Sequence, residues 1–328
     1  MRILITGGAG FIGSHLAEAY LQRGDEVFII DDLSTGSRDN LRHLEDDPQF
    51  NDRLHVTVDS VLSHAPMLEL VGTCDLVVHL AAAVGVQYII DNPLSSIVTN
   101  VRGTETVLEL CAKFRKKVMI ASTSEVYGKH NHAPLSEDED CVYGPSTKSR
   151  WSYAASKLID EFTALAYHRS KKLPVVITRF FNTVGPRQSG RYGMVIPRFV
   201  QQALNHEPIT VYGDGTQTRT FTHVRDAVRG VMKLLEAPEA VGQVVNIGGN
   251  EEVTILGLAQ RIKEKARSRS EVSLVPYDEV FPENFEDMLR RVPSTAKLYK
   301  LTGLTPTCDL NHILDDIIAY HRRVKEAR

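Results

Sequence analysis

Apolar residues in the first half of the chain form short unbroken runs, and longer amphipathic segments separate them. Such runs predict strands, and the segments between them predict helices. We expect strands at Arg2–Thr6, Glu26–Asp31, Asp75–Leu80, Val118–Ser122 and Val175–Arg179, and helices at Gly13–Arg23, Pro93–Lys113 and Ser152–His168. Strands that are apolar throughout and alternate with helices are typical of a parallel sheet covered on both faces. The pattern therefore predicts an α/β fold with a doubly wound parallel sheet.

The pattern changes after about residue 180, where prolines and glycines cluster. Beyond that point we expect a strand at Val244–Ile247 and helices at Asp226–Leu235, Ile255–Ala266 and Leu310–Lys325. Because this strand can return to the first sheet, we predict a large nucleotide-binding domain of residues 1–180 joined by residues 222–250. Residues 181–328 are expected to supply a smaller α/β region that binds the substrate.

Charge and hydropathy exclude several classes of protein. The chain has 328 residues, with 38 Lys and Arg against 41 Asp and Glu, and a formal net charge of −3. Nucleic-acid-binding proteins usually show a basic excess, so we expect no nucleic acid partner. No run of 18 apolar residues occurs, and the N-terminus has no apolar signal core, so we expect neither a membrane span nor secretion. These features favour a cytoplasmic protein.

The four cysteines, Cys74, Cys111, Cys141 and Cys308, lie far apart in the sequence and form no CxxC pair. Their spacing matches no zinc site, and they are expected to be reduced thiols that serve mostly in packing. We therefore expect no bound metal.

A glycine-rich segment follows the first predicted strand and opens the first predicted helix. Gly7, Gly10 and Gly13 are spaced as GxxGxxG, and Phe11 and Ile12 stand between the last two. A diphosphate can approach such a backbone closely, and the helix N-terminus offers unpaired N–H groups and the positive end of a dipole. In this strand–turn–helix context the segment indicates a Rossmann-type dinucleotide site rather than a simple turn.

Acidic residues at the next strand ends indicate which dinucleotide binds. Asp31 and Asp32 end the second strand, where this fold places the carboxylate for the adenosine ribose. A carboxylate there favours NAD and repels the 2′-phosphate of NADP. Asp59 is a candidate contact for the adenine edge, and Leu80 and Ala81 end a further strand where a flat cofactor can pass.

The candidate catalytic residues come from two segments. Tyr153 and Lys157 form a YxxxK pair, which shares one face of a helix. An ammonium beside a phenol is expected to lower its pKa, which would make Tyr153 a base near neutral pH. Thr123, Ser124 and Glu125 follow the strand at Val118–Ser122 and face the same crevice.

Together these motifs resemble the extended branch of the short-chain dehydrogenase/reductase superfamily, the NAD-dependent nucleotide-sugar epimerases, dehydratases and decarboxylases. The resemblance covers nearly the whole chain. It rests on TGGAGFIGSH (Thr6–His15), DDLSTG (Asp31–Gly36), HLAAA (His79–Ala83), NVRGT (Asn100–Thr104), STSEVYG (Ser122–Gly128), YAASK (Tyr153–Lys157), RFFNTVGPR (Arg179–Arg187) and VYGDGTQTRTF (Val211–Phe221).

The resemblance implies roles for individual residues. Tyr153 would take the proton of the sugar 4-hydroxyl, Lys157 would hold the cofactor ribose, and Thr123 would hydrogen-bond the same sugar oxygen. A hydride would pass from C4 to a tightly bound NAD, and a 4-keto sugar would result. The substrate-binding residues would be Tyr88, Asn182, Tyr212, Arg219 and Arg291.

The resemblance leaves the reaction open. The Thr-Ser-Glu sequence at Thr123–Glu125 matches UDP-glucuronate decarboxylases, and dTDP-glucose-type dehydratases carry Asp-Glu after the threonine. We expect a UDP-glucuronate decarboxylase, with a UDP-sugar 4-epimerase as the alternative and a 4,6-dehydratase as the third reading. A hypothesis of a different class is a non-catalytic NAD-binding regulator. Its signature would be a broken Tyr/Lys pair, but Tyr153 and Lys157 are both present. As in the family, we expect a homodimer.

Overall fold

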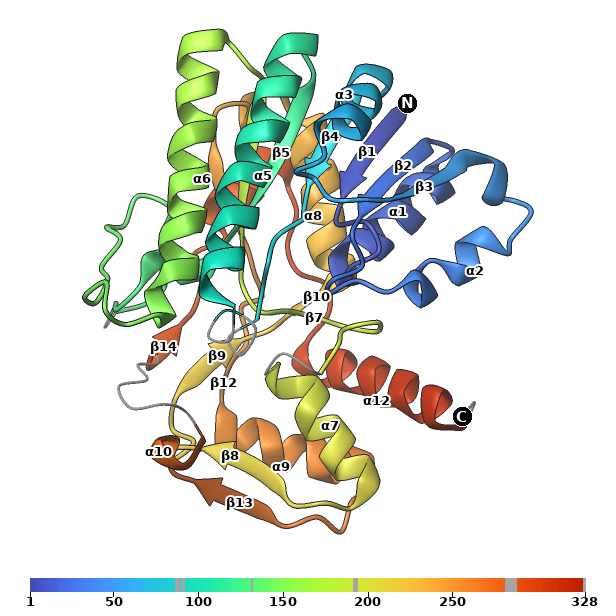
Figure 1. Ribbon diagram of the computed structural model, residues 1–328. Helices are drawn as coiled ribbons and strands as arrows, with labels where there is room; N and C mark the ends of the chain where they lie inside the picture. The colour runs from blue at the N-terminus through green and yellow to red at the C-terminus, as the bar shows by residue number, and fades with distance from the viewer. Residues whose placement is uncertain (86–88, 90–91, 131, 191–193, 281–287, 327–328) are drawn as a thin grey trace.

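A seven-stranded parallel sheet forms the centre of the protein in the computed structural model (Figure 1). The structure describes residues 1–85, 89, 92–130, 132–190, 194–280 and 288–326. The strand order is β11-β6-β5-β4-β1-β2-β3. The strands are β1 (Arg2–Thr6), β2 (Glu26–Asp31), β3 (Leu54–Val58), β4 (Leu76–His79), β5 (Lys117–Thr123), β6 (Val175–Phe180) and β11 (Val244–Ile247). The order reverses between β1 and β4, which is typical of a doubly wound sheet.

Helices cover both faces of this sheet because successive side chains of a strand point to opposite sides. Ile3 and Ile5 pack in a core with α1 (Phe11–Arg23) and α8 (Val224–Glu236). Leu4, between them, packs on the other face with α3 (His64–Thr73) and α5 (Pro93–Phe114), where α6 (Arg150–Lys171) also lies. Figure 1 shows α5 and α6 side by side on that face. The expected doubly wound α/β fold is confirmed.

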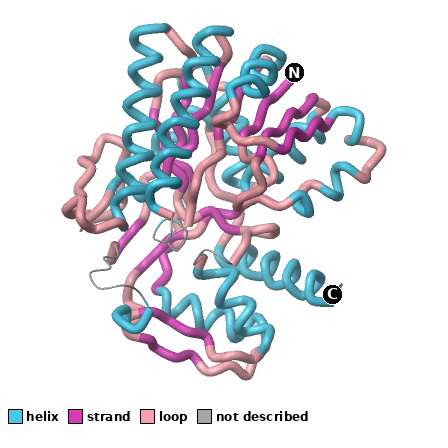
Figure 2. Tube along the Cα trace, viewed as in Figure 1, coloured by secondary structure: helices cyan, strands magenta, loops and turns pink. Residues whose placement is uncertain are grey.

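A second region follows β6 and has its own apolar core. Its strands are β7 (Thr183–Val184), β8 (Ile209–Tyr212), β9 (Thr218–Thr220), β10 (Thr222–His223), β12 (Glu252–Thr254), β13 (Val272–Val275) and β14 (Arg290–Arg291). Its helices α7 (Val195–Asn205), α9 (Ile255–Ala266) and α12 (Leu310–Glu326) pack around one another. In Figure 2 the paired strands β8 and β13 lie at the opposite end of the molecule from the N-terminus.

Several element boundaries differ from the sequence prediction for local reasons. Helix α8 begins at Val224 rather than Asp226, because the His223 side chain caps it by accepting a hydrogen bond from the Arg225 amide. Helix α6 begins at Arg150, two residues earlier than expected. The strand at Val244–Ile247 pairs with β6 in the central sheet.

The remaining elements are short. They are η1 (Arg38–Asn40), α2 (Arg42–Glu45), η2 (Asn51–Arg53), η3 (Ser124–Tyr127), η4 (Pro238–Ala240), α10 (Tyr277–Val280) and α11 (Ala296–Thr302). Among the described residues, no helix combines the length and apolar character that crossing a bilayer requires. The four cysteines are free thiols, and Cys74 and Cys111 are buried.

Candidate functional site

The glycine loop is folded tightly at the carboxyl end of β1. Gly7 has a φ of +71°, and a Cβ on it would lie 2.7 Å from the Ala81 nitrogen. A Cβ on Gly13 would collide with the Gly7 carbonyl oxygen, whereas a Cβ on Gly10 would meet only that oxygen, at 3.1 Å. Gly7 and Gly13 therefore keep the turn tight, and Gly10 leaves open backbone at the start of α1.

Helix α1 begins at Phe11 and Ile12, and no side chain caps its N-terminus. The first-turn N–H groups of a helix have no partner within the helix, and the dipole there favours an anion. Both residues are half-buried, and Phe11 packs against the core beneath the loop. This combination of an uncapped helix start and an open glycine fits the diphosphate of a dinucleotide.

Asp31 holds the glycine loop to the second strand. One carboxylate oxygen accepts a hydrogen bond from the Ala9 amide at 2.9 Å, and the other accepts one from the Leu33 amide at 2.9 Å. Burial raises the pKa of Asp31, and the hydrogen bonds from Leu33 and Ala9 only partly oppose it. The carboxylate thus lies at the edge of the loop, where the ribose of a dinucleotide is expected.

Two other predicted cofactor residues follow the ends of β2 and β3 and hold the turns there. The exposed Asp32 accepts a hydrogen bond from the Ser34 amide at 2.9 Å. Asp59 uses one oxygen to accept from the Ser60 amide and the Ser63 hydroxyl, so its side chain supports the turn before α3. Hydrogen bonding by Ser63 lowers the pKa of Asp59.

Leu80 and Ala81 continue from β4 alongside the glycine loop. Their amides donate to the carbonyl and the hydroxyl of Thr6, at 3.1 and 3.2 Å. The chain after β4 is therefore fixed directly against the end of β1. One border is formed by the five predicted residues of the glycine loop together with Asp31, Leu80 and Ala81. The uncapped N–H groups at the start of α1 and the open backbone at Gly10 fit NAD.

Tyr153 and Thr123 face each other at the end of β5. The Thr123 hydroxyl acts on the Tyr153 phenol and favours its ionised form, and Thr123 also caps η3 by accepting from the Glu125 amide at 3.2 Å. Ser124 lies buried in the same short helix. Burial raises the pKa of Tyr153, the charges of Glu125 and Asp160 raise it further, and the bond to Thr123 opposes them.

The pKa of Tyr153 is therefore raised in this structure, mainly by burial, whereas the YxxxK pair predicted a lowered pKa beside Lys157. The Lys157 ammonium donates to Asp160 at 2.7 Å, and both side chains are almost fully buried. Asp160 offsets the positive charge of the lysine and adds a negative charge near the phenol. The sequence placed Asp160 three residues after Lys157 on the same helix, and this signal was overlooked.

Glu125 lies between two arginines from distant parts of the chain. Its carboxylate forms ion pairs with Arg150, at 2.6 Å, and with Arg291. All three side chains are at most 13% exposed. Burial opposes ionisation of Glu125, but Arg150 and Arg291 outweigh it and hold the pKa at about 2. Two guanidiniums around one carboxylate leave a net positive charge in a buried place.

Arg150 was not among the predicted site residues. It stands three residues before Tyr153, which places the two on neighbouring positions of α6. That spacing is the sequence signal that could have identified it.

The structure brings Asn182, Arg219 and Arg291 together. Arg291 donates to the side-chain oxygen of Asn182 at 2.7 Å, and Asn182 donates through its amide nitrogen to the Thr220 carbonyl at 2.8 Å. Arg219 and Arg291 are register partners in the pairing of β9 with β14. The charge of Arg219 also contributes to the low pKa of Glu125.

Tyr212 belongs to a separate group in the second region. The guanidinium of Arg198, from α7, lies 3.9 Å from the centre of the Tyr212 ring. Arg198 also donates to the Thr210 hydroxyl at 2.7 Å. A cation stacked on an aromatic ring is suited to a nucleotide, which offers a flat base and phosphate charge. Tyr88, the other predicted contact, lies outside the described residues.

Comparison with known proteins shows which family the chain belongs to. The model of the GDP-mannose 4,6-dehydratase family matches residues 4–317. The chain belongs to this family. The resemblance to extended short-chain dehydrogenases/reductases that act on nucleotide sugars is therefore confirmed, and the protein is an enzyme of that group.

Individual relatives are similar over almost the full chain. UDP-N-acetyl-α-D-glucosaminuronate decarboxylase of Bacillus cytotoxicus is 41% identical, over 99% of this chain and 98% of that one. UDP-glucuronic acid decarboxylase 4 of Arabidopsis thaliana is 37% identical, over 93% of this chain and 65% of that one. UDP-glucuronic acid 4-epimerase of Bacillus cereus, in a crystal structure with UDP-glucuronic acid and NAD, has a TM-score of 0.88 and 30% identity. That similarity covers 99% of this chain and 100% of the epimerase.

Proposed function

We propose that the protein is an NAD-dependent decarboxylase of a UDP-linked hexuronic acid, with UDP-glucuronate as the first substrate to test. The arrangement of Arg150 and Arg291 around Glu125 carries this proposal. A sugar carboxylate needs a cation when it leaves water, and the planar fork of arginine suits a carboxylate. The decarboxylase relatives support the same reaction.

The cofactor in this proposal is NAD, as in the epimerase complex. Gly10 and the start of α1 would hold its diphosphate, and Asp31 its adenosine ribose. Lys157 retains two N–H donors beyond the one used by Asp160, and these can hold the second ribose. When bound, NAD supplies a hydride acceptor beside C4 of the sugar and later returns the hydride.

Tyr153 is the proposed base for the sugar 4-hydroxyl. The Thr123 hydroxyl is close enough to the Tyr153 phenol to favour its ionisation, so we propose that a sugar hydroxyl bound here would meet both. Tyr153 would take the 4-hydroxyl proton as the C4–H bond breaks, and would give a proton back when the carbonyl is reduced. Thr123 would orient the shared oxygen.

Arg291 and Arg150 would bind the sugar C6 carboxylate. In the resulting 4-keto sugar this carboxylate is β to the carbonyl, so its bond to C5 can break with the electron pair moving toward C4. After CO2 has left, C5 takes up one proton from solvent, and the 4-carbonyl is then reduced. Glu125 has a pKa of about 2 and is anionic at neutral pH, which makes it a poor proton donor in this arrangement. We therefore assign it the role of holding the two arginines and repelling the carboxylate that is lost as CO2.

A second candidate is 4-epimerisation of the same UDP-uronic acid. The B. cereus epimerase favours it, because that structure contains UDP-glucuronic acid and NAD and matches the whole chain. A positively charged C6 site serves both reactions, so only the fate of the carboxylate distinguishes them.

The test is incubation of the purified protein with UDP-glucuronate labelled at C6, with trapping of CO2 and NMR of the sugar product. UDP-N-acetylglucosaminuronate, the substrate in the name of the B. cytotoxicus relative, is tested in parallel. We expect labelled CO2 and a UDP-pentose from at least one substrate. Inversion at C4 with the label retained would establish the epimerase instead, and release of CO2 from neither substrate rejects the decarboxylase proposal.

We also propose a homodimer that pairs α5 and α6. These neighbouring helices expose apolar side chains, of which Phe162 is 61%, Ile159 50% and Leu94 75% exposed. Covering them with the same helices of a second copy would remove this surface from water. Sedimentation of the wild type and of a Phe162→Glu variant tests the dimer.

The free thiols support the expectation of a reducing compartment such as the cytoplasm.

A further inference from the structure

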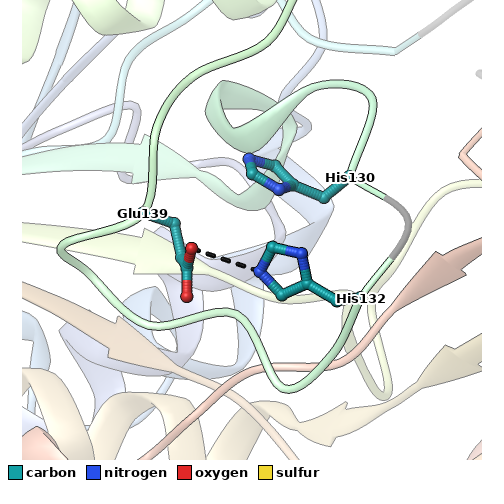
Figure 3. Close-up of side chains that lie close together, drawn as sticks. All are labelled: His130, His132 and Glu139. Carbon is teal, nitrogen blue, oxygen red and sulfur yellow. Dashed lines mark ion pairs between the residues drawn. The ribbon is translucent and has the colours of Figure 1, made fainter.

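Two histidines and a glutamate meet in the loop between η3 and α6, outside the site described above. His130, His132 and Glu139 each offer one ligand atom, and these atoms all lie within 4.8 Å of one another. Figure 3 shows the two imidazoles and the carboxylate gathered together, with His132 paired to Glu139. We propose that these three side chains form a binding site for a divalent transition-metal ion of the Zn²⁺ type.

The separations fit such an ion. Zinc binds imidazole nitrogen and carboxylate oxygen at about 2.0–2.2 Å, so in tetrahedral geometry its ligand atoms lie roughly 3.4 Å apart. The His132 Nε2 and Glu139 Oε2 atoms are 3.1 Å apart, which is close to that separation. The ligand atom of His130 lies within 4.8 Å of both. An oxygen and two nitrogens make three ligands, and water can occupy the fourth position.

Neighbouring groups orient two of the three ligands. The Nε2 atom of His130 is bound to the Asp140 carbonyl at 2.6 Å, which leaves Nδ1 with its lone pair for the metal. The other oxygen of Glu139 accepts a hydrogen bond from the Ser136 hydroxyl at 3.3 Å. Metal-binding histidines and carboxylates are commonly held in this way by a second layer of hydrogen bonds.

The surrounding charge also favours a cation. Residues 137–140 read Glu-Asp-Glu-Asp, so three further carboxylates stand beside Glu139 in the sequence. The two histidine rings are in edge-to-face contact, with centroids 4.9 Å apart, so they are already close without an ion. Metal binding would replace the exposed ion pair between His132 and Glu139. Such a pair contributes little to the stability of the fold because water surrounds it.

Metal binding to the loop that carries His130, His132 and Glu139 would affect the segment that holds Arg291. Between the ligands, Leu135 accepts a hydrogen bond from the Ser294 amide at 2.7 Å and donates to the Val292 carbonyl at 2.8 Å. Val292 is the residue after Arg291. A metal bound to His130, His132 and Glu139 would therefore restrain a loop that is hydrogen-bonded directly to the chain beside the candidate site.

The experiment titrates the full chain, without a histidine tag, with Zn²⁺ alone against a chromophoric chelator. We expect one equivalent to bind, and binding to weaken at least tenfold in His130→Ala, His132→Ala and Glu139→Gln. Two controls should bind as the wild type does. His55→Ala removes a surface histidine paired with a glutamate, at 2.8 Å to Glu26, and Cys141→Ser removes the thiol nearest in sequence.

Thermal unfolding gives a second measurement that does not depend on activity. Zn²⁺ should raise the unfolding temperature of the wild type and of His55→Ala, and should leave that of His132→Ala unchanged. Because His132 is 56% exposed, this variant should fold normally. The proposal would be overturned if the wild type did not bind Zn²⁺, or if the three ligand variants bound Zn²⁺ as tightly as the wild type does.

Discussion

Lys157 and Asp160 form a buried ion pair on one face of α6, with the ammonium nitrogen 2.7 Å from a carboxylate oxygen. The pair places a negative charge near the phenol of Tyr153, where a lone lysine would place a positive one. Asp160 is thereby a determinant of the pH at which Tyr153 can lose its proton.

Replacing Asp160 with Asn should shift the acidic limb of the pH–rate profile to lower pH. The charge of Asp160 raises the pKa of Tyr153, so its removal lowers that pKa. A base works only when deprotonated, and its active fraction then rises from a lower pH. The measurement is kcat/KM from pH 5 to 9. Asp315→Asn, which removes an exposed carboxylate paired with Lys265, is the control, and an equal profile in all three proteins contradicts the prediction.

Tyr153→Phe should reduce turnover on the order of a hundredfold or more and leave nucleotide binding nearly intact. Only the proton-accepting oxygen is lost, and the ring keeps its place beside Thr123. Single-turnover kinetics and calorimetric titration with UDP separate the two effects. Turnover at the wild-type rate would show that another group is the base.

Glu125→Gln should slow CO2 release and still allow oxidation at C4, so a 4-keto species should accumulate. The amide keeps the size of the side chain but loses the negative charge between Arg150 and Arg291. Trapping the ketone with borodeuteride followed by mass spectrometry detects it. On the epimerase reading, the same variant inverts C4 at a nearly normal rate.

The stability of the folded protein at low pH should depend on the Glu125 carboxylate. The pKa of Glu125 is lowered from 4.5 to about 2 in the folded protein. Its ionisation therefore stabilises the fold above pH 4.5, and this contribution is lost as the pH falls toward 2. Urea unfolding across this range should show a steeper loss in the wild type than in Glu125→Gln. Glu109→Gln, exposed on α5, should follow the wild type.

Arg150→Met should raise KM for a UDP-uronic acid by about 10- to 150-fold, the range for one hydrogen bond to a charged group. Binding of UDP alone should change little, because UDP has no C6 carboxylate. Arg169→Met removes an exposed arginine from the same helix and is the matched control. Equal KM values for the two variants would exclude Arg150 from the carboxylate site.

The sequence was most informative where a local pattern determines the structure. The glycine spacing required a tight turn between β1 and α1, and the apolar runs identified every strand of the central sheet except β3. The family resemblance grouped five residues as substrate contacts. The structure brings Asn182, Arg219 and Arg291 together, whereas Tyr212 packs with Arg198 in a separate group.

Ion pairs between charged side chains were harder to predict from the sequence. Arg150 and Arg291 are 141 positions apart in the sequence, and long-range contacts such as the pairing of β14 with β9 bring the second to Glu125. The expectation of a lowered pKa for Tyr153 overlooked the burial of the phenol and the charges of Glu125 and Asp160, and Asp160 has no motif of its own. The His130–His132–Glu139 cluster was missed because metal ligands were sought among cysteines.

The ion pair between Glu125 and Arg291 also bears on how the protein is made. Glu125 lies 166 residues before its partner, and the edge strand β11 of the central sheet is completed only at Ile247. A ribosome-bound or truncated chain that ends before residue 290 contains the glycine loop, Tyr153 and Lys157, but lacks the second guanidinium. No contiguous half of the chain holds the site. A library of C-terminal truncations should therefore lose the reaction in one step, well before it loses the dinucleotide-binding loop.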